Sequence, residues 1–277
     1  MTRDAMTYDV VIVGGGPAGL STAIRLRQLC QQHAVDLSIC ILEKGAEVGA
    51  HILSGAVIDP IALNELLPDW QQLDPPLHTP VTQDLFYYLT ASHAVRLPLP
   101  GLMRNKGHYI VSLSNLCRWL ATQAESLGID IFPGFAAVDY VTDDQECVTG
   151  VITGDMGVNK QHEPGPQFQP GIQLQCQRLI LAEGCRGSLT EKIIANFALR
   201  KDCEMQTYAI GIKELWRVNS SHYRCGQVIH TVGWPLDQRT YGGSFIYQMD
   251  EQLVALGLVV GLDYQNPWLD PFEELQR

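Results

Sequence analysis

The feature that most constrains the fold is a glycine-rich turn between an apolar run and a helical stretch near the start of the chain. Residues 8–13 (YDVVIV) read as a buried parallel strand, and Gly14, Gly16 and Gly19 follow at G-x-G-x-x-G spacing. The first glycine permits a tight turn, the second lets the backbone approach a pyrophosphate, and the third lets helix and strand pack closely. With a second strand at 37–45, the pattern predicts a βαβ unit that binds a dinucleotide.

Glu43 lies near the end of the second strand, where a carboxylate accepts hydrogen bonds from the ribose hydroxyls of an adenosine. Its charge also repels a 2′-phosphate, which disfavours NADP. The helix after the loop presents unpaired N–H groups and the positive end of its dipole to phosphates. A glycine-rich turn without a ligand is the alternative interpretation, and the loop alone does not decide between FAD and NAD.

A second segment favours FAD. Residues 179–188 (LILAEGCRGS) form a strand that ends in Ala182, Glu183 and Gly184, with Ser188 beyond. This resembles the A-[DE]-G-x-x-S segment of FAD-dependent hydroxylases and of reductases of the glutathione reductase type, where the turn passes close to the flavin dinucleotide. An ordinary strand-to-helix turn is the alternative. We therefore expect an α/β fold with a Rossmann-type FAD-binding domain of the glutathione reductase type.

The order of apolar, helical and turn-rich segments along the sequence suggests two domains. Residues 6–195 are expected to form the FAD-binding domain, in which the proline-rich stretch 46–106 is an insertion and 113–127 an amphipathic helix ending at Gly128. After about residue 196, β-rich segments separated by turn residues predict a second, α+β domain over 196–277.

Composition excludes several classes of protein. A net charge of -11 argues against nucleic-acid binding, which depends on phosphate neutralisation, and no apolar run is long enough to span a bilayer. The 8 cysteines are scattered without a C-x-x-C, which indicates free thiols in a reducing compartment and neither a zinc nor an iron-sulfur site. The first residues carry no signal region, so we expect a cytoplasmic chain or a processed one.

Several long strings in both expected domains resemble electron transfer flavoprotein-ubiquinone oxidoreductases. They are EVGAHILSGAVIDPIALNELLPDW (47–70), TPVT (79–82), GIKELW (211–216), HTVGWPL (230–236), TYGGSF (240–245) and GLDYQNP (261–267). The resemblance implies electron transfer from electron transfer flavoprotein to ubiquinone, on the inner membrane of mitochondria or on the cytoplasmic face of a bacterial one. It also implies FAD and a 4Fe-4S cluster in a C-terminal domain, and we expect this chain to end before that domain.

The resemblance also implies two further sites. Gly242 and Gly243 correspond to the ubiquinone-contact loop, where residues without a Cβ let a flat ring reach the backbone, although paired glycines also indicate a hairpin turn. Residues 48–70 correspond to a membrane-contacting segment, for which core packing is the alternative. Ser112 departs from the family pattern, because related flavoproteins often have a cofactor-contacting Arg there.

We assign no catalytic residue and no metal ligand in this chain, because the flavin and the cluster carry the electrons. Two other interpretations remain open. One is a related flavin reductase that hydrogenates an isoprenoid lipid, and the other is a truncated FAD-binding fragment without turnover. The strings after residue 210 favour the quinone reductase.

Overall fold

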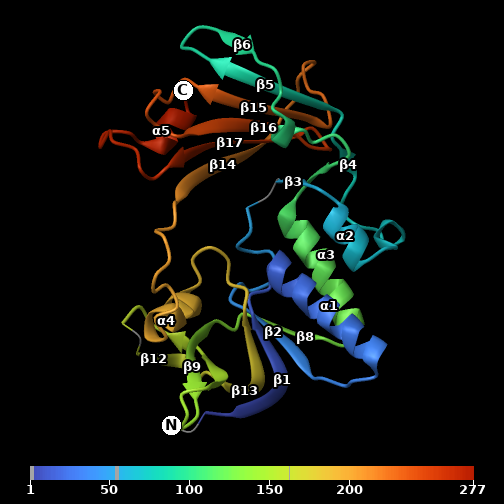
Figure 1. The fold of residues 1–277 in the computed structure, drawn as a ribbon, viewed down its shortest axis with the longest axis vertical. Coiled ribbons are helices and arrows are strands. Elements are labelled where there is room, and N and C mark those ends of the chain that lie inside the picture. Colours follow the sequence, from blue (N-terminus) through green and yellow to red (C-terminus); the bar gives the residue numbers. More distant parts are fainter. Residues whose placement is uncertain (1–2, 54–55, 162) are drawn as a thin grey trace. The chain divides into compact units, whose positions relative to one another are not determined.

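The computed structural model describes residues 3–53, 56–161 and 163–277. Contacts within the chain divide it into two compact units, each built from two separate stretches of sequence. The first unit comprises Met1–Ile52 and Cys117–Cys203, and the second comprises Leu53–Leu116 and Glu204–Arg277. Figure 1 labels the helices and strands of both units.

A six-stranded sheet forms the centre of the first unit, in the order β8-β2-β1-β13-β10-β9. Four strands run parallel, namely β8 (Asp130–Pro133), β2 (Ile39–Glu43), β1 (Ala5–Val13) and β13 (Gln173–Leu181). The antiparallel strands are β10 (Val148–Thr153) and β9 (Ala137–Thr142). Val13 pairs with both Leu42 and Leu181, so the carboxyl ends of three parallel strands meet at one edge. Ligands bind at this edge in open parallel sheets.

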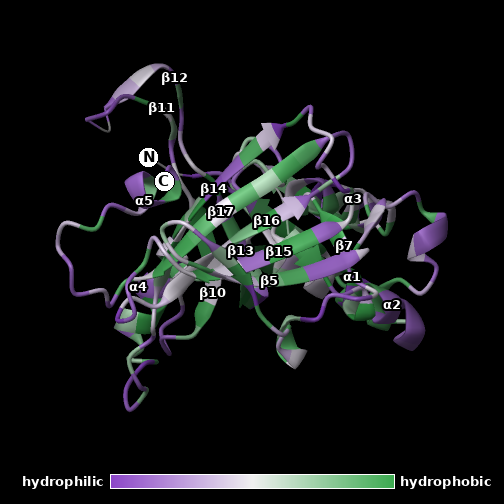
Figure 2. Ribbon diagram, turned by 90° about the horizontal axis from the view of Figure 1, so that it is seen from above, coloured by the Kyte–Doolittle hydropathy of each residue, from purple (hydrophilic) through white to green (hydrophobic). Residues whose placement is uncertain are grey.

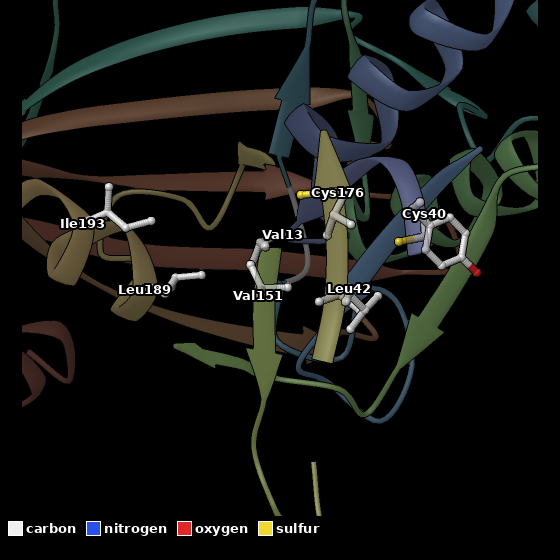
Figure 3. Close-up of a cluster of buried hydrophobic side chains, with 10 residues drawn as sticks. Val13, Cys40, Leu42, Val151, Cys176, Leu189 and Ile193 are labelled. Atoms are coloured by element: carbon white, nitrogen blue, oxygen red, sulfur yellow. The ribbon is translucent and has the colours of Figure 1, made fainter. Parts of the chain in front are cut away.

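The core of the first unit joins the sheet to the helix after β13. Val13, Leu42 and Val151 from three strands are at most 4% exposed, and Leu189 and Ile193 from α4 (Ser188–Asn196) pack into the same cluster. Figure 3 shows this cluster. Side chains of this size are each worth roughly 1.5 to 3 kcal/mol when fully buried. Their burial holds the strand ends and the start of α4 at fixed positions.

Two longer helices and a hairpin complete the first unit. The helix α1 (Pro17–His33) follows the glycine-rich turn and ends at Ala34, whose φ of 51° is left-handed, with Val35 N–H donating to the Cys30 carbonyl at 2.9 Å. The helix α3 (Leu113–Ser126) contains the boundary between the units. The strands β11 (Met156–Val158) and β12 (Pro164–Gln169) form a separate two-stranded sheet.

A second six-stranded sheet dominates the second unit, in the order β14-β17-β16-β15-β5-β6. Its strands are β14 (Ala209–Arg217), β17 (Leu253–Gly261), β16 (Gly242–Gln248), β15 (Gln227–Gly233), β5 (Gln83–Leu89) and β6 (Ala94–Arg96). Figure 2 shows hydrophobic stretches on β14, β17, β16, β15 and β5, interrupted by hydrophilic ones. β15 pairs in parallel with β5 and antiparallel with β16.

Smaller elements surround this sheet. A three-stranded sheet has the order β3-β7-β4, with β3 (Ala56–Ile58), β7 (Tyr109–Val111) and β4 (Thr79–Pro80). The short helices are α2 (Ile61–Leu66), α5 (Pro271–Leu275) and the 3₁₀ turns η1 (Trp70–Gln72) and η2 (Gly101–Met103). Among the described residues, none of the helices has both the length and the apolar character needed to cross a membrane.

The structure groups the inserted stretch differently from the sequence-based division into 6–195 and 196–277. Residues 53–116 belong to the same compact unit as 204–277. The physical reason is strand pairing, because β5 hydrogen-bonds along its whole length with β15, from Gln83 beside Gln227 to Leu89 beside Gly233. The insertion thus supplies two strands to the sheet of the second unit.

Candidate functional site

The glycine-rich loop lies at the carboxyl edge of the parallel strands. Gly14 N–H donates to the Leu42 carbonyl at 2.8 Å, and Ala182 N–H donates to the Val13 carbonyl at 2.8 Å. Gly14 has φ +114°, and a Cβ added there would lie 2.3 Å from the Ala182 carbonyl oxygen. The two sequence segments predicted to contact the cofactor are therefore in direct contact with each other.

The other two glycines of the G-x-G-x-x-G motif, Gly16 and Gly19, differ in what surrounds them. A Cβ on Gly19 would lie 2.0 Å from the Gly14 carbonyl oxygen, so this glycine lets α1 pack against the turn. A Cβ on Gly16 would meet nothing within 4 Å. Gly16 is the N-cap of α1, and no side chain caps its N–H groups. Open space beside uncapped N–H groups is what a pyrophosphate needs.

Glu43 is held beside this open space by the backbone. Its Oε2 accepts from Gly15 N–H at 2.9 Å, and its Oε1 accepts from Gly45 N–H at 2.7 Å. A carboxylate has about four acceptor sites, so two remain for ribose hydroxyls. The structure thus places Glu43 against the loop, while its predicted contact with a ribose stays a prediction.

The turn at Ala182, Glu183 and Gly184 has a structural function that the sequence did not reveal. Glu183 Oε2 accepts from Thr190 N–H at 2.7 Å and from Thr190 Oγ1 at 2.6 Å, so its carboxylate caps the first turn of α4. Gly184 has φ +84°. A Cβ on Gly187 would lie 2.4 Å from Glu183 Cβ, which keeps this side chain close to the helix start. The flavin contact predicted for these three residues remains a prediction.

Gly242 and Gly243 begin β16 and do not lie in a hairpin turn. A Cβ on Gly242 would lie 2.2 Å from the Val259 carbonyl oxygen and 2.5 Å from Leu236 Cδ1. A Cβ on Gly243 would lie 2.4 Å from the Thr231 carbonyl oxygen. Close packing within the sheet therefore requires both glycines, whether or not a ring approaches them. Their contact with ubiquinone stays a prediction.

The segment 48–70 combines buried and exposed apolar residues, and its residues 54 and 55 lie outside the described part of the chain. Leu63 is 4% and Trp70 3% exposed, and Trp70 Nε1 donates to Asn64 Oδ1 at 2.8 Å. In contrast, Leu53 is 64% and Ile61 60% exposed. On α2, Leu63 is thus buried in the protein, whereas Ile61 is exposed and available for an external contact.

The cysteines are free thiols, and several are buried. Burial raises the pKa of Cys40 to about 12 and the pKa of Cys117 to about 11, which keeps both protonated at neutral pH. Among the described residues, no group of three or more His, Cys, Asp or Glu side chains is arranged to hold a metal ion. In the second unit, a cavity of about 320 Å³ is lined by residues that include His78, Asn115 and Asp250 but neither Gly242 nor Gly243.

Two family models match the chain. Residues 12–70 match the NAD(P)-binding Rossmann-like domain, and residues 208–277 match the domain described as ETF-QO, ubiquinone-binding. The first match contains the glycine-rich loop and Glu43, and the second contains Gly242 and Gly243. The predicted α/β fold, with a Rossmann-type domain followed by a quinone-binding domain, is confirmed.

Two curated relatives with the same name illustrate the match. The mitochondrial electron transfer flavoprotein-ubiquinone oxidoreductase of Oryza sativa subsp. japonica is 53% identical over 277 residues, which cover 99% of this chain and 48% of the relative. The Homo sapiens protein of the same name is 52% identical over 281 residues, covering 100% of this chain and 46% of the relative. The resemblance found in the sequence is thus confirmed, and the chain spans about half the length of the curated relatives it matches.

Solved structures share the fold at low identity. A geranylgeranyl bacteriochlorophyll reductase-like protein from Thermoplasma acidophilum has a TM-score of 0.68 at 16% identity, over 99% of this chain and 61% of that chain. A myxobacterial chondrochloren halogenase, described as a variant of FAD-dependent halogenases, has a TM-score of 0.57 at 13% identity, over 93% of this chain and 53% of that chain. These likenesses concern the fold alone.

Proposed function

Because the chain is related in sequence to the electron transfer flavoprotein-ubiquinone oxidoreductases, we propose that the protein containing it takes electrons from reduced electron transfer flavoprotein and passes them to ubiquinone at a membrane surface. The proposal rests on one observation. The same chain contains a glycine-rich loop with open space beside Gly16, where a dinucleotide can bind, and a segment that matches a ubiquinone-binding family model. A 4Fe-4S cluster is expected elsewhere in the complete protein.

FAD is the cofactor that fits the loop. Gly16 supplies open backbone for the pyrophosphate, and Glu43 supplies acceptors for the ribose of the adenosine. The 182–184 turn, which contacts Gly14, lines the same edge of the sheet. FAD, when bound, supplies the redox chemistry, so the chain needs no acid, base or nucleophile for the electron steps. Its own residues bind and orient the cofactor.

Ubiquinone is proposed to bind the second unit, near Gly242 and Gly243, since the ubiquinone-binding family model contains both. The membrane is proposed to contact residues 48–70 through the exposed side chains of Leu53 and Ile61. Burying such a side chain in the interfacial layer is worth roughly 1.5 to 3 kcal/mol. This would place the protein peripherally on an inner membrane, mitochondrial or bacterial.

The lipid-reductase interpretation has one observation in its favour, the TM-score of 0.68 with a geranylgeranyl reductase-like protein. That likeness extends only to the fold, because the identity is 16%. The rice and human quinone oxidoreductases are 53% and 52% identical over 99% and 100% of this chain, which favours quinone over an isoprenoid double bond.

The test requires the complete protein that contains this chain. Flavin absorbance follows electron entry from reduced electron transfer flavoprotein, and the absorbance of a short-chain ubiquinone analogue follows electron exit. We expect both reactions in the parent and neither in Gly16→Val, which fills the pyrophosphate space. Reduction of an isoprenoid double bond in place of the quinone would overturn the proposal and establish the alternative.

A further inference from the structure

One face of the large sheet in the second unit carries an aligned row of side chains. Phe245 on β16 pairs with His230 on β15 and, on its other side, with Gly257 on β17. Gly257 in turn pairs with Lys213 on β14. Directly paired residues project from the same face of a sheet, as do residues two apart along a strand. Gly243 and Tyr247, two residues before and after Phe245, therefore share this face.

The rings on this face, Phe245, Tyr247 and His230, form what we call the aromatic platform. Phe245 stacks on Tyr247 with ring centroids 4.7 Å apart and an interplanar angle of 27°. Tyr247 meets His230 edge-on at 5.7 Å, and its hydroxyl lies 3.2 Å from His230 Nε2. Phe245 lies over Gly257, where an added Cβ would be 2.5 Å from its Cζ. All three platform residues are partly buried. Tyr247 packs against the buried cluster of Ile110, Val228, Met249 and Ala255, so the core fixes this end of the platform, and Phe245 lies farther along the face.

The platform is uncharged at neutral pH. Burial lowers the pKa of His230 below its usual value, and the nearby Asp84 carboxylate opposes this only in part. Burial also raises the pKa of Tyr247, so its hydroxyl keeps its proton. At the end of the row, Lys213 Nζ lies 5.5 Å from the centre of the Phe245 ring. A neutral polar pair beside stacked rings suits a planar, uncharged ligand that carries carbonyl groups.

His230 has hydrogen-bonding capacity that the protein does not use. Its Nδ1 is buried and has no partner among the residues that the structure describes. An unpaired buried nitrogen costs free energy, so it indicates a further partner. When Tyr247 donates its hydroxyl proton to Nε2, the imidazole carries its own proton on Nδ1 and presents a donor there. A ring carbonyl is an acceptor of matching type.

We propose that the aromatic platform receives the headgroup ring of the quinone, with Phe245 as its stacking partner and His230, oriented by Tyr247, as hydrogen-bond donor to a ring carbonyl. The inference rests on the proposed quinone reduction and extends that site from Gly243 along β16. Two residues of strand span about 7 Å, so a ring beside Gly243 also reaches Phe245. The proposal concerns binding and adds no step to the reaction.

The experiment uses the complete protein and three variants, Phe245→Leu, His230→Phe and Tyr247→Phe. Equilibrium dialysis measures binding of a short-chain ubiquinone analogue without electron donor, and steady-state assays give its KM and kcat. We expect Phe245→Leu and His230→Phe to raise both Kd and KM at least tenfold, and Tyr247→Phe to raise them less. The pH profile of KM should flatten in His230→Phe. Flavin reduction by electron transfer flavoprotein should stay at the parent rate.

The matched control is Ile246→Val, because Ile246 lies on the same strand with its side chain on the opposite face. Its KM should stay within twofold of the parent. If His230→Phe does not fold, the nearly isosteric Tyr247→Phe decides. Parent-like Kd and KM in the folded platform variants would overturn this inference alone. A parent protein that neither binds nor reduces the quinone would overturn the proposed function as well.

Discussion

The carbonyl oxygen of Ala182 lies 2.3 Å from the point where a Cβ on Gly14 would stand. This contact ties the loop after β1 to the turn after β13, two segments more than 160 residues apart in sequence. Because the strands are parallel and in register up to Val13 and Leu181, their carboxyl ends leave no room for a side chain between them.

The first prediction follows from this contact. Gly14→Ala should destabilise the first unit by about 2 to 5 kcal/mol. The alanine would have to adopt a positive φ, and its Cβ would clash with the Ala182 carbonyl oxygen. Urea unfolding of the chain measures the destabilisation. A loss below about 0.5 kcal/mol would mean that the turn after β13 moves freely away from the loop.

Gly16 should behave in the opposite way. Because a Cβ there meets nothing within 4 Å, Gly16→Ala should change the free energy of unfolding by less than about 1 kcal/mol, the usual cost of an N-cap change. FAD affinity should fall at least tenfold, about 1.4 kcal/mol, since the methyl group enters the pyrophosphate space. Fluorescence titration measures this. Unchanged FAD affinity in a folded variant would remove Gly16 from the cofactor site.

Local sequence patterns predicted the first βαβ unit because each of its parts is encoded by neighbouring residues. Gly14 and Gly19 fill the steric roles that their spacing suggested, and Glu43 is held against the loop. The pairing of β5 with β15 was not predictable in this way. Its partners lie about 140 residues apart, and alternation within a strand says nothing about which strand lies beside it.

The cap at α4 was missed for a different reason. Glu183 precedes Thr190 by seven residues, a longer separation than the three-residue spacing of an ordinary capping box. The sequence therefore indicates only that Glu183 resembles the acidic residue of a cofactor turn. In the structure, the absence of a side chain at Gly187 leaves room for Glu183 to fold back onto the start of the helix.

Glu183 therefore offers the third prediction. Glu183→Ala should destabilise the chain by about 1 to 2 kcal/mol, because Thr190 N–H loses its acceptor at the start of α4. Chemical denaturation without FAD isolates this effect from cofactor binding. If stability were unchanged and only FAD affinity fell, the carboxylate would serve the cofactor and not the helix.

The fourth prediction concerns alkaline pH. The pKa of Cys40 is raised to about 12 in the folded chain, whereas an ordinary thiol titrates near 9. Since the raised value belongs to the folded state, the associated stability is fully present below pH 9 and is lost as the pH rises towards 12. The free energy of unfolding should fall across this window, and less steeply in Cys40→Ala. Equal slopes for parent and variant would show that Cys40 ionises freely in the folded state.

The last prediction tests the membrane contact of residues 48–70. Ile61 is 60% exposed on α2, whereas Leu63, two residues later, is 4% exposed. If Ile61 enters the interfacial layer, Ile61→Glu removes roughly 1.5 to 3 kcal/mol of burial, a loss of about ten- to a hundredfold in binding of the complete protein to liposomes. Its thermal transition should move little, because the side chain is mostly exposed. Leu63→Glu is the matched control, and it should instead lower the thermal transition by burying a charge. Cosedimentation with liposomes separates the two cases. Parent-like liposome binding by a folded Ile61→Glu protein would exclude this helix as the contact, and the exposed Leu53 would be the next residue of the segment to test.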